Sequence, residues 1–171
     1  AMTLLHLGPG LSNGLSNLHN ARRAHTPLIN IVGDHATFHR HYDPPLASDI
    51  VSLARPVSGW VHTASDAAEL SRDGALSLKA SLAPPGQVST LIVPADAAWG
   101  EAGEIAVPEQ VPLPSSVSQE QIRRVAEVLR SGEPAGLLVR GPALMERGLQ
   151  ALSRLAGKSG ARLMCDTFSP R

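Results

Sequence analysis

The chain has 171 residues, of which 15 are basic and 15 acidic. This balance gives no electrostatic reason to expect binding to nucleic acid or to an anionic membrane. No apolar run approaches the roughly 20 residues that cross a bilayer, and no signal peptide is evident. The single cysteine, Cys165, excludes an internal disulfide, so the composition predicts a soluble, cytoplasmic α/β protein that is poor in aromatic residues.

The segment from Thr3 to Pro45 carries the most informative pattern. A short apolar run, Leu4 to Leu7, stops at Gly8-Pro9-Gly10, leucines then recur at helical spacing, and a second apolar run follows at residues 28–33. A strand, a glycine turn, a helix and a second strand form a βαβ unit, which predicts a parallel sheet. Ligands bind beyond the carboxyl ends of such strands, so a site is expected at the glycine turn and at Gly33-Asp34-His35.

Residues 46–96 continue the alternation of helices and strands. We expect a short helix at residues 46–53 and a strand at residues 58–63. The next helix is expected to be capped by Ser65 and to bury a stripe of leucines, namely Leu70, Leu76, Leu78 and Leu82. A buried strand, residues 88–93, ends at Pro94-Ala95-Asp96. Together these segments predict a parallel sheet with flanking helices.

A second pattern begins after residues 100–116, which are rich in proline, glycine and small polar residues and predict an interdomain linker. Ser118 and Gln121 form a capping box that opens a helix. A strand (136–139), a helix (Pro142 to Lys158) and a strand (162–165) that buries Cys165 as a small hydrophobe follow. We therefore expect a first domain at residues 1–99, the linker at 100–116 and the start of a second domain at 117–171, which alone is small for a domain.

The glycines after the first strand allow several interpretations. The simplest is a tight turn in which they supply unusual backbone dihedral angles. Alternatively, Gly8, Gly10 and Gly14 fit a loose dinucleotide-binding spacing, and Asp34 lies about twenty residues further on, where a ribose-binding acid is expected. The second interpretation predicts an NAD(P)-binding oxidoreductase module.

A third interpretation rests on resemblance. The residues concerned are LHLGPGLSNGLSNLHNARRAHTPLINIVGDHATFHRHYDPPLASDI, and they resemble the pyrimidine-binding domain of thiamine-diphosphate-dependent enzymes of the acetolactate-synthase-like group. In that family Gly-Pro-Gly-x-x-Asn follows a strand, the next strand ends in a Gly-polar loop near the reactive thiazolium, and the last ends in a Pro-x-Asp turn. The linker and the start of a central domain then follow in the same order. The resemblance covers nearly the whole chain, so we prefer it.

The resemblance implies a parent enzyme that joins or cleaves carbon–carbon bonds of 2-oxo acids with thiamine diphosphate and magnesium. The residues implied to shape the cofactor pocket are Gly8, Pro9, Gly10 and Asn13. The residues implied to border the substrate are His35 and His39. The family's activating glutamate lies on a strand that precedes Thr3, and its metal-binding motif lies in a C-terminal domain. We therefore expect a piece of a larger enzyme that binds no cofactor of its own and is inactive alone.

The loop after Gly33 is dense in histidine, with His35, His39 and His41. Imidazole groups move protons near pH 7, which suits carboligation or decarboxylation. Two other interpretations remain open: these side chains are solvated, or His35 and His39, at helical spacing, bind zinc. Since no second cluster of ligands supports zinc, no metal site is predicted.

The strand at the start of the chain predicts a partner. Without the strand that flanks it in the family, Thr3 to Leu7 would form an exposed apolar edge, which invites pairing with another chain. We expect self-association or binding to a longer partner chain through this strand. A non-catalytic assembly or regulatory subunit that pairs with a catalytic partner is a further hypothesis.

Overall fold

The computed structural model describes residues 1–167. The chain divides into two compact units, the first comprising residues 1–113 and the second beginning at residue 114. The last four residues of the segment predicted as the start of a second domain lie outside the described residues. Within the described part, no helix is long and apolar enough to cross a membrane.

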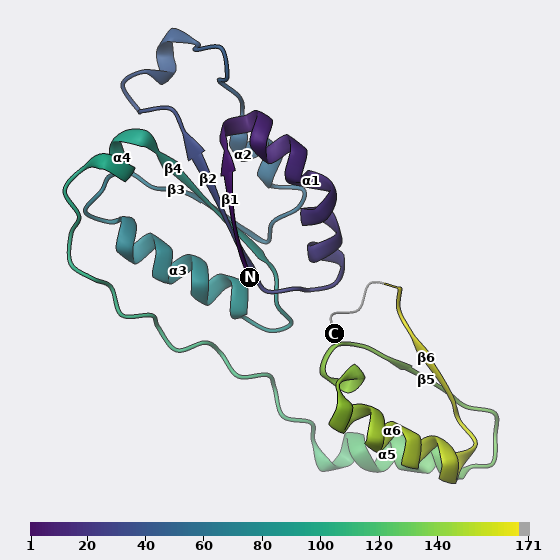
Figure 1. Cartoon of the computed structure of the whole chain (residues 1–171). Helices are drawn as coiled ribbons and strands as arrows, with labels where there is room; N and C mark the ends of the chain where they lie inside the picture. Colours follow the sequence, from purple (N-terminus) through teal and green to yellow (C-terminus); the bar gives the residue numbers. More distant parts are fainter. Residues whose placement is uncertain (168–171) are drawn as a thin grey trace. The chain divides into compact units, whose positions relative to one another are not determined.

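The first unit is built on a four-stranded sheet in the order β1-β2-β4-β3, in which every pair is parallel (Figure 1). This confirms the predicted parallel sheet with flanking helices. The strands are β1 (Met2–His6), β2 (Leu28–Asp34), β3 (Trp60–Thr63) and β4 (Val88–Pro94). The helices are α1 (Leu7–Arg23), α2 (Ile50–Ala54), α3 (Leu70–Leu82) and α4 (Ala95–Trp99), with a 3-10 turn, η1 (Arg40–Tyr42).

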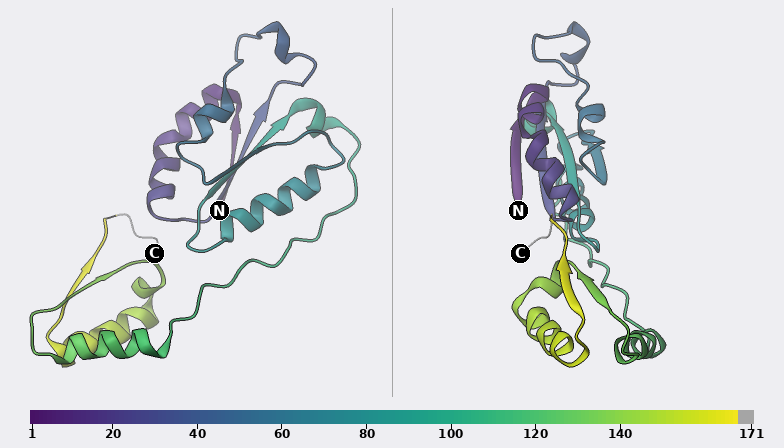
Figure 2. Two further views of the ribbon diagram at one scale, coloured as in Figure 1. Left: turned by 180° about the vertical axis from the view of Figure 1, so that it is seen from behind. Right: turned by 90° about the vertical axis from the view of Figure 1, so that its right-hand side faces the viewer.

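The helices α1 and α2 cover one face of this sheet (Figure 2), and an apolar core joins them to it. Leu11 and Leu18 of α1, predicted at helical spacing, are buried against Val32 and Ile92 of the two central strands. Every residue of β4 is buried, as predicted for the strand at residues 88–93. Because β4 lies between β2 and β3 and is covered on both faces, it is the most completely buried strand of the sheet.

A row of polar side chains crosses the same face of the sheet. Thr3 donates a hydrogen bond to Asn30 (2.8 Å), Asn30 donates to Thr90 (3.0 Å), and the hydroxyl groups of Ser58 and Thr90 are 2.7 Å apart. Asn30 and Thr90 have no exposed surface. Their polar groups are therefore satisfied by one another across three strands, which fixes the lateral register of the sheet.

The face of α3 that packs on the sheet is polar, contrary to the predicted leucine stripe. Asp73, Ser77 and Ser81 are its buried residues, and the hydroxyl groups of Ser77 and Ser89 are 2.9 Å apart. The four leucines of the predicted stripe are half-buried or exposed. Small side chains let the helix approach the sheet closely while hydrogen bonds satisfy their hydroxyl groups.

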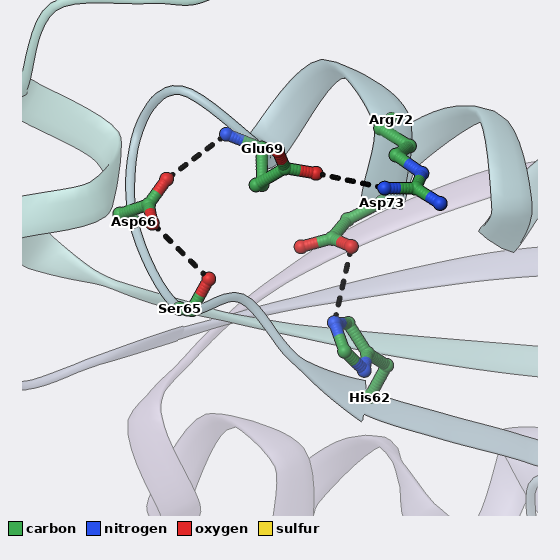
Figure 3. Close-up of polar contacts among 6 residues, drawn as sticks. All are labelled: His62, Ser65, Asp66, Glu69, Arg72 and Asp73. Carbon is green, nitrogen blue, oxygen red and sulfur yellow. Dashed lines mark hydrogen bonds and ion pairs between the residues drawn. The ribbon is translucent and has the colours of Figure 1, made fainter.

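The start of α3 also differs from the prediction (Figure 3). Ser65 does not cap the helix; its hydroxyl donates to Asp66 (3.3 Å), and Asp66 accepts the backbone N–H of Glu69 (3.0 Å), so the helix begins only at Leu70. At the end of β3, His62 lies 3.1 Å from the buried carboxylate of Asp73. His62 is therefore a paired residue of an edge strand.

Residues 100–113, most of the predicted linker, contain no helix or strand but are held against α3 (Figures 1 and 2). The backbone N–H of Ala106 donates to Ser71 (2.9 Å), and Glu109 forms an ion pair with Lys79. The hydrogen bond and charge of Lys79 lower the pKa of Glu109. Ala106 and Glu109 therefore join this part of the chain to α3.

The second unit pairs two parallel strands, β5 (Gly136–Val139) and β6 (Arg162–Cys165), with two helices, α5 (Gln119–Arg130) and α6 (Glu146–Ser159). The capping box is confirmed, since Ser118 and Gln121 bond each other's backbone amides (3.2 and 3.0 Å). The helix predicted from Pro142 is split, because a 3-10 turn, η2 (Gly141–Leu144), precedes α6. Cys165 is exposed, so its predicted burial is wrong: within residues 1–167, β6 pairs with β5 alone, and all its residues are exposed.

Candidate functional site

The junction between β1 and α1 contains no glycine turn. The strand ends at His6 and the helix begins at Leu7, whose backbone takes the left-handed conformation with φ of 57°. Gly8, Pro9 and Gly10 lie inside the first turns of the helix. Pro9 is tolerated there because the first turn of a helix needs no N–H from that residue. The predicted turn, with glycines supplying unusual dihedral angles, is therefore wrong.

The glycines of α1 serve close packing instead. A Cβ atom on Gly8 would overlap the side chain of Ser48, and one on Gly14 would lie 2.9 Å from Leu5 Cδ1. A Cβ atom on Gly10 would stand 3.4 Å from the backbone carbonyl carbon of Leu5. Only the Gly8 position lacks room for a Cβ atom outright, because the Leu5 side chain can shift away from Gly14 and the contact at Gly10 is an ordinary van der Waals distance. The first two turns of α1 thereby lie tightly against β1 and against the segment before α2.

The carboxyl ends of three strands meet at the edge where a site was expected. In the register of the sheet His6 lies opposite Gly33, and Asp34 lies opposite Pro94. The loop that follows β2, residues 35–43, is here called the histidine loop, and it projects beyond the end of the strand (Figure 1). The start of α1, the histidine loop and the start of α4 therefore share this edge.

Asp34 holds the near end of the histidine loop. Its Oδ1 accepts the backbone N–H of His35 (2.7 Å), and its Oδ2 forms an ion pair with Arg40 (3.0 Å). The Asp34 side chain is only 10% exposed. Both oxygens of this carboxylate are thus committed to the loop itself, as expected for a largely buried acid.

Asp96 holds the same loop from the neighbouring strand end. Its Oδ1 accepts the backbone N–H of Thr37 (3.0 Å), and its Oδ2 accepts the Thr37 hydroxyl group. These two hydrogen bonds, the hydroxyl bond first, hold the pKa of Asp96 below its ordinary value. Two carboxylates at adjacent strand ends therefore fix the loop at His35, Thr37 and Arg40.

The predicted histidines are brought together by this loop. The rings of His35 and His39 meet edge to face with centroids 5.7 Å apart, and His39 lies 6.0 Å from the ring of Tyr42. Nε2 of His35 is buried and has no hydrogen-bond partner among the described residues, whereas His39 is exposed. A buried imidazole nitrogen without a partner is rare in folded proteins.

The residues expected to shape a cofactor pocket lie on the first two turns of α1. Gly8 is buried and Gly10 half-buried, whereas Pro9 and Asn13 are exposed. His6 makes no side-chain cap on this helix, and the first turn has no acidic residue. Neither the N-cap residue nor the first turn therefore supplies an acidic group to the positive end of this helix.

The structure argues against the dinucleotide interpretation. A dinucleotide fingerprint needs a glycine loop between strand and helix, and here Gly8, Gly10 and Gly14 lie within α1. The carboxylate of Asp34, expected to bind a ribose, is occupied by His35 and Arg40. Within residues 1–167, no group of three or more His, Cys, Asp or Glu residues is placed to hold a metal ion.

Sequence reasoning missed the residues that hold the loop. Thr37 and Arg40 were part of a polar stretch without periodicity, and Asp96 was only the end of a turn. The one available signal was the position of Asp34 and Asp96 directly after buried strands, which places both at the same edge of a parallel sheet.

Comparison with known proteins identifies similar chains. Residues 1–68 match the family model "Thiamine pyrophosphate enzyme, N-terminal TPP binding domain". A Mycobacterium tuberculosis protein, "Putative acetolactate synthase large subunit IlvX", is 48% identical over 168 residues, which cover 98% of this chain and 32% of that protein.

Solved structures agree with this similarity. The thiamine diphosphate-dependent 4-hydroxybenzoylformate decarboxylase of Rhodococcus jostii RHA1 superimposes with a TM-score of 0.80 at 25% identity, over 96% of this chain and 32% of its own. A Mycobacterium smegmatis protein described as "a putative thiamin diphosphate-dependent enzyme" gives 0.76 at 26% identity, over 100% and 33%. The chain thus spans about a third of the length of these relatives.

Proposed function

Because this chain is similar along its length to thiamine-diphosphate-dependent enzymes of the acetolactate-synthase-like group, we propose that it forms one wall of the active site of such an enzyme. The reaction is carboligation or decarboxylation of 2-oxo acids in the cytoplasm. The single observation that carries the proposal is the buried, unpartnered Nε2 of His35 at the carboxyl edge of the sheet. A group bound at this edge would supply the missing hydrogen bond.

In this proposal the chain's residues divide into two sets. Pro9 and Asn13 meet the cofactor from the exposed side of α1, while Gly8 and Gly10 allow the helix to approach β1 and Ser48. His35 and His39 border the substrate and hold or move a proton near it. Thiamine diphosphate, when bound, supplies the carbanion-stabilising chemistry. Magnesium is bound with the diphosphate by other parts of the parent enzyme.

We assign residues 1–99 to the pyrimidine-binding part, 100–116 to the connection and 117–171 to the central part of the enzyme. No position among these 171 residues matches the family's activating glutamate or its metal-binding motif. The isolated chain is therefore proposed to be inactive and to bind no cofactor. It completes a site with a second copy or with a longer thiamine-diphosphate-binding chain.

Co-expression with a longer thiamine-diphosphate-binding chain tests this function. The two chains should purify together, and the assembly should consume pyruvate, which neither the 171-residue chain nor its His35→Gln variant alone should do. In the assembly, His35→Gln should lower kcat by about 10²-fold, the usual size of an acid–base contribution. His19→Gln, on the exposed face of α1, is the control. Undiminished turnover with His35→Gln would contradict the assigned role.

The open edge of the sheet favours an assembly role as a second candidate. β1 pairs with β2 alone within the described residues, and its Met2 and Leu4 side chains are 67% and 77% exposed. A non-catalytic subunit would use this strand to bind a catalytic partner without contributing to turnover. Co-purification with turnover that is insensitive to His35→Gln would favour this candidate.

A further inference from the structure

The histidine loop is held by hydrogen bonds and an ion pair. Secondary-structure propensity and hydrophobic burial do not account for its conformation. Of its side chains, Phe38 and Tyr42 are 71% and 70% exposed, so apolar burial does little to fix its conformation. The only regular structure in it is the single turn of η1. A loop of this composition needs other contacts to adopt one conformation.

Two carboxylates supply these contacts from two different strands. Asp34, at the end of β2, bonds the start of the loop through the N–H of His35 and its far part through Arg40. Asp96, at the start of α4 beyond β4, bonds the middle of the loop at Thr37, through both the N–H and the hydroxyl group. The loop is therefore fixed at three points along nine residues.

The three fixed residues of the loop, His35, Thr37 and Arg40, include or flank both histidines of the candidate site. His35 lies directly beside the Asp34 bond, and His39 lies between Thr37 and Arg40, each of which is held. With both sides fixed, the rings of His35 and His39 keep their edge-to-face contact at 5.7 Å, and Nε2 of His35 stays buried.

We propose that Asp34 and Asp96 are positioning residues that hold the histidine loop so that His35 and His39 face the reaction centre together. They act through Arg40 and Thr37 and contact no reacting group themselves. The reaction-centre part of this statement rests on the proposed function. The positioning part concerns this chain alone.

Nuclear magnetic resonance of the 171-residue chain tests the positioning. In Asp34→Ala and in Asp96→Ala, the ring proton shifts of His35 and His39 should move to the values of free histidine, and amide exchange at residues 37–42 should rise at least tenfold. Methyl signals of the core residues Val32 and Ile92 should stay unchanged, which separates loop release from unfolding. Asp96→Asn, which keeps one oxygen to accept the Thr37 N–H, should restore part of the ring shifts.

Asp66→Ala is the matched control, because Asp66 also accepts a backbone N–H, from Glu69 at 3.0 Å, but lies at the start of α3 (Figure 3). It should leave the histidine signals in place. If an alanine variant unfolds, Thr37→Val removes only the hydroxyl bond to Asp96 and Arg40→Gln only the ion pair with Asp34, and the ring shifts should move in the same direction by a smaller amount. Ring shifts that stay at wild-type values in the Asp34 and Asp96 variants would overturn the positioning role.

The ring shifts and amide exchange of the isolated chain do not depend on enzyme turnover. A failure here removes the positioning role and leaves the proposed function standing. Failure of the assembled enzyme to depend on His35, with the ring shifts behaving as expected, removes the proposed function and leaves the positioning role in place.

Discussion

The left-handed backbone conformation between β1 and α1 is taken by Leu7 and not by the glycine that follows it. This conformation costs a leucine about 1–2 kcal/mol. Leu7 is 4% exposed, so burying its side chain at the head of α1 offsets this cost. Gly8 is required for a different reason, because Ser48 leaves no room for a Cβ atom. A sequence pattern marks such a position as glycine but does not say whether dihedral angle or space demands it.

Gly8→Ala should lower the free energy of unfolding by about 1–3 kcal/mol, the usual cost of overpacking. The physical reason is the overlap of the new methyl group with the Ser48 side chain. The double variant with Ser48→Gly should recover most of the loss, and urea denaturation measures both. Gly74→Ala is the control: no atom lies within 4 Å of its Cβ position in α3, so it should stabilise the chain by about 0.5–1 kcal/mol. Equal effects of the two alanines would contradict the steric account.

The contact between Asp96 and Thr37 should respond to acid. The hydrogen bonds from Thr37 lower the pKa of Asp96 in the folded chain from its ordinary 3.8. A carboxyl group with a lowered pKa stabilises the fold above its ordinary pKa and loses that contribution as the pH falls through the folded value. The protection factor of the Thr37 amide, which is its exchange rate relative to the intrinsic rate at the same pH, should therefore be constant from pH 7 to about pH 4 and fall below. A fall already between pH 7 and 5 would show that another group controls the loop.

At the scale of elements, periodicity predicted the sheet better than the helix that covers its second face. The strand at residues 88–93 and the leucines of α1 follow directly from apolar patterns, because one face of α1 and both faces of β4 are buried. For α3 the apolar pattern misleads, because Asp73, Ser77 and Ser81 pack on the sheet, whereas the four leucines are half-buried or exposed. Hydrogen bonds between distant segments, such as Ser77 to Ser89, carry no local signal in a sequence.

For the candidate site too, one part could be predicted from the sequence and another could not. Its location followed from strand order alone, since the carboxyl ends of parallel strands share an edge. The contacts that shape it, from Asp34 to Arg40 and from Asp96 to Thr37, depend on loop geometry. No periodicity predicts such contacts, because the loop has neither repeating side chains nor regular backbone.

The polar row across the sheet gives a prediction at this scale. Thr90→Val removes the hydroxyl group that bonds both Asn30 and Ser58. Since Asn30 is fully buried, its unpaired amide should cost about 1–3 kcal/mol in the free energy of unfolding. Thr63→Val, at the half-buried end of β3, is the matched control and should change it by less than about 0.5 kcal/mol. An equally mild effect of Thr90→Val would mean that the row does not fix the register.

At the scale of the whole molecule, β1 is the feature from which we predict association. It lies at the edge of the sheet, and Met2 and Leu4, on the face of the sheet that carries α3, are largely exposed. Unpaired backbone groups beside apolar side chains favour pairing with another strand. The similarity of this chain to about a third of much longer thiamine-diphosphate-dependent proteins is consistent with such pairing.

Sedimentation velocity should therefore detect self-association of the isolated chain that grows with concentration. Leu4→Lys should weaken it at least tenfold, because charged residues on an edge strand oppose pairing. Leu82→Lys, at an exposed position on α3, should leave it unchanged. A monomer at all concentrations, with the amides of β1 protected from exchange, would contradict this role of the strand.

The central claim is that this chain supplies walls of a thiamine-diphosphate site but not the groups that bind and activate the cofactor. Calorimetric titration of the 171-residue chain with thiamine diphosphate and magnesium tests it most directly. The account predicts no heat of binding at micromolar cofactor, and saturable binding only after a longer thiamine-diphosphate-binding chain is added. Saturable binding at micromolar cofactor to the chain alone would contradict it.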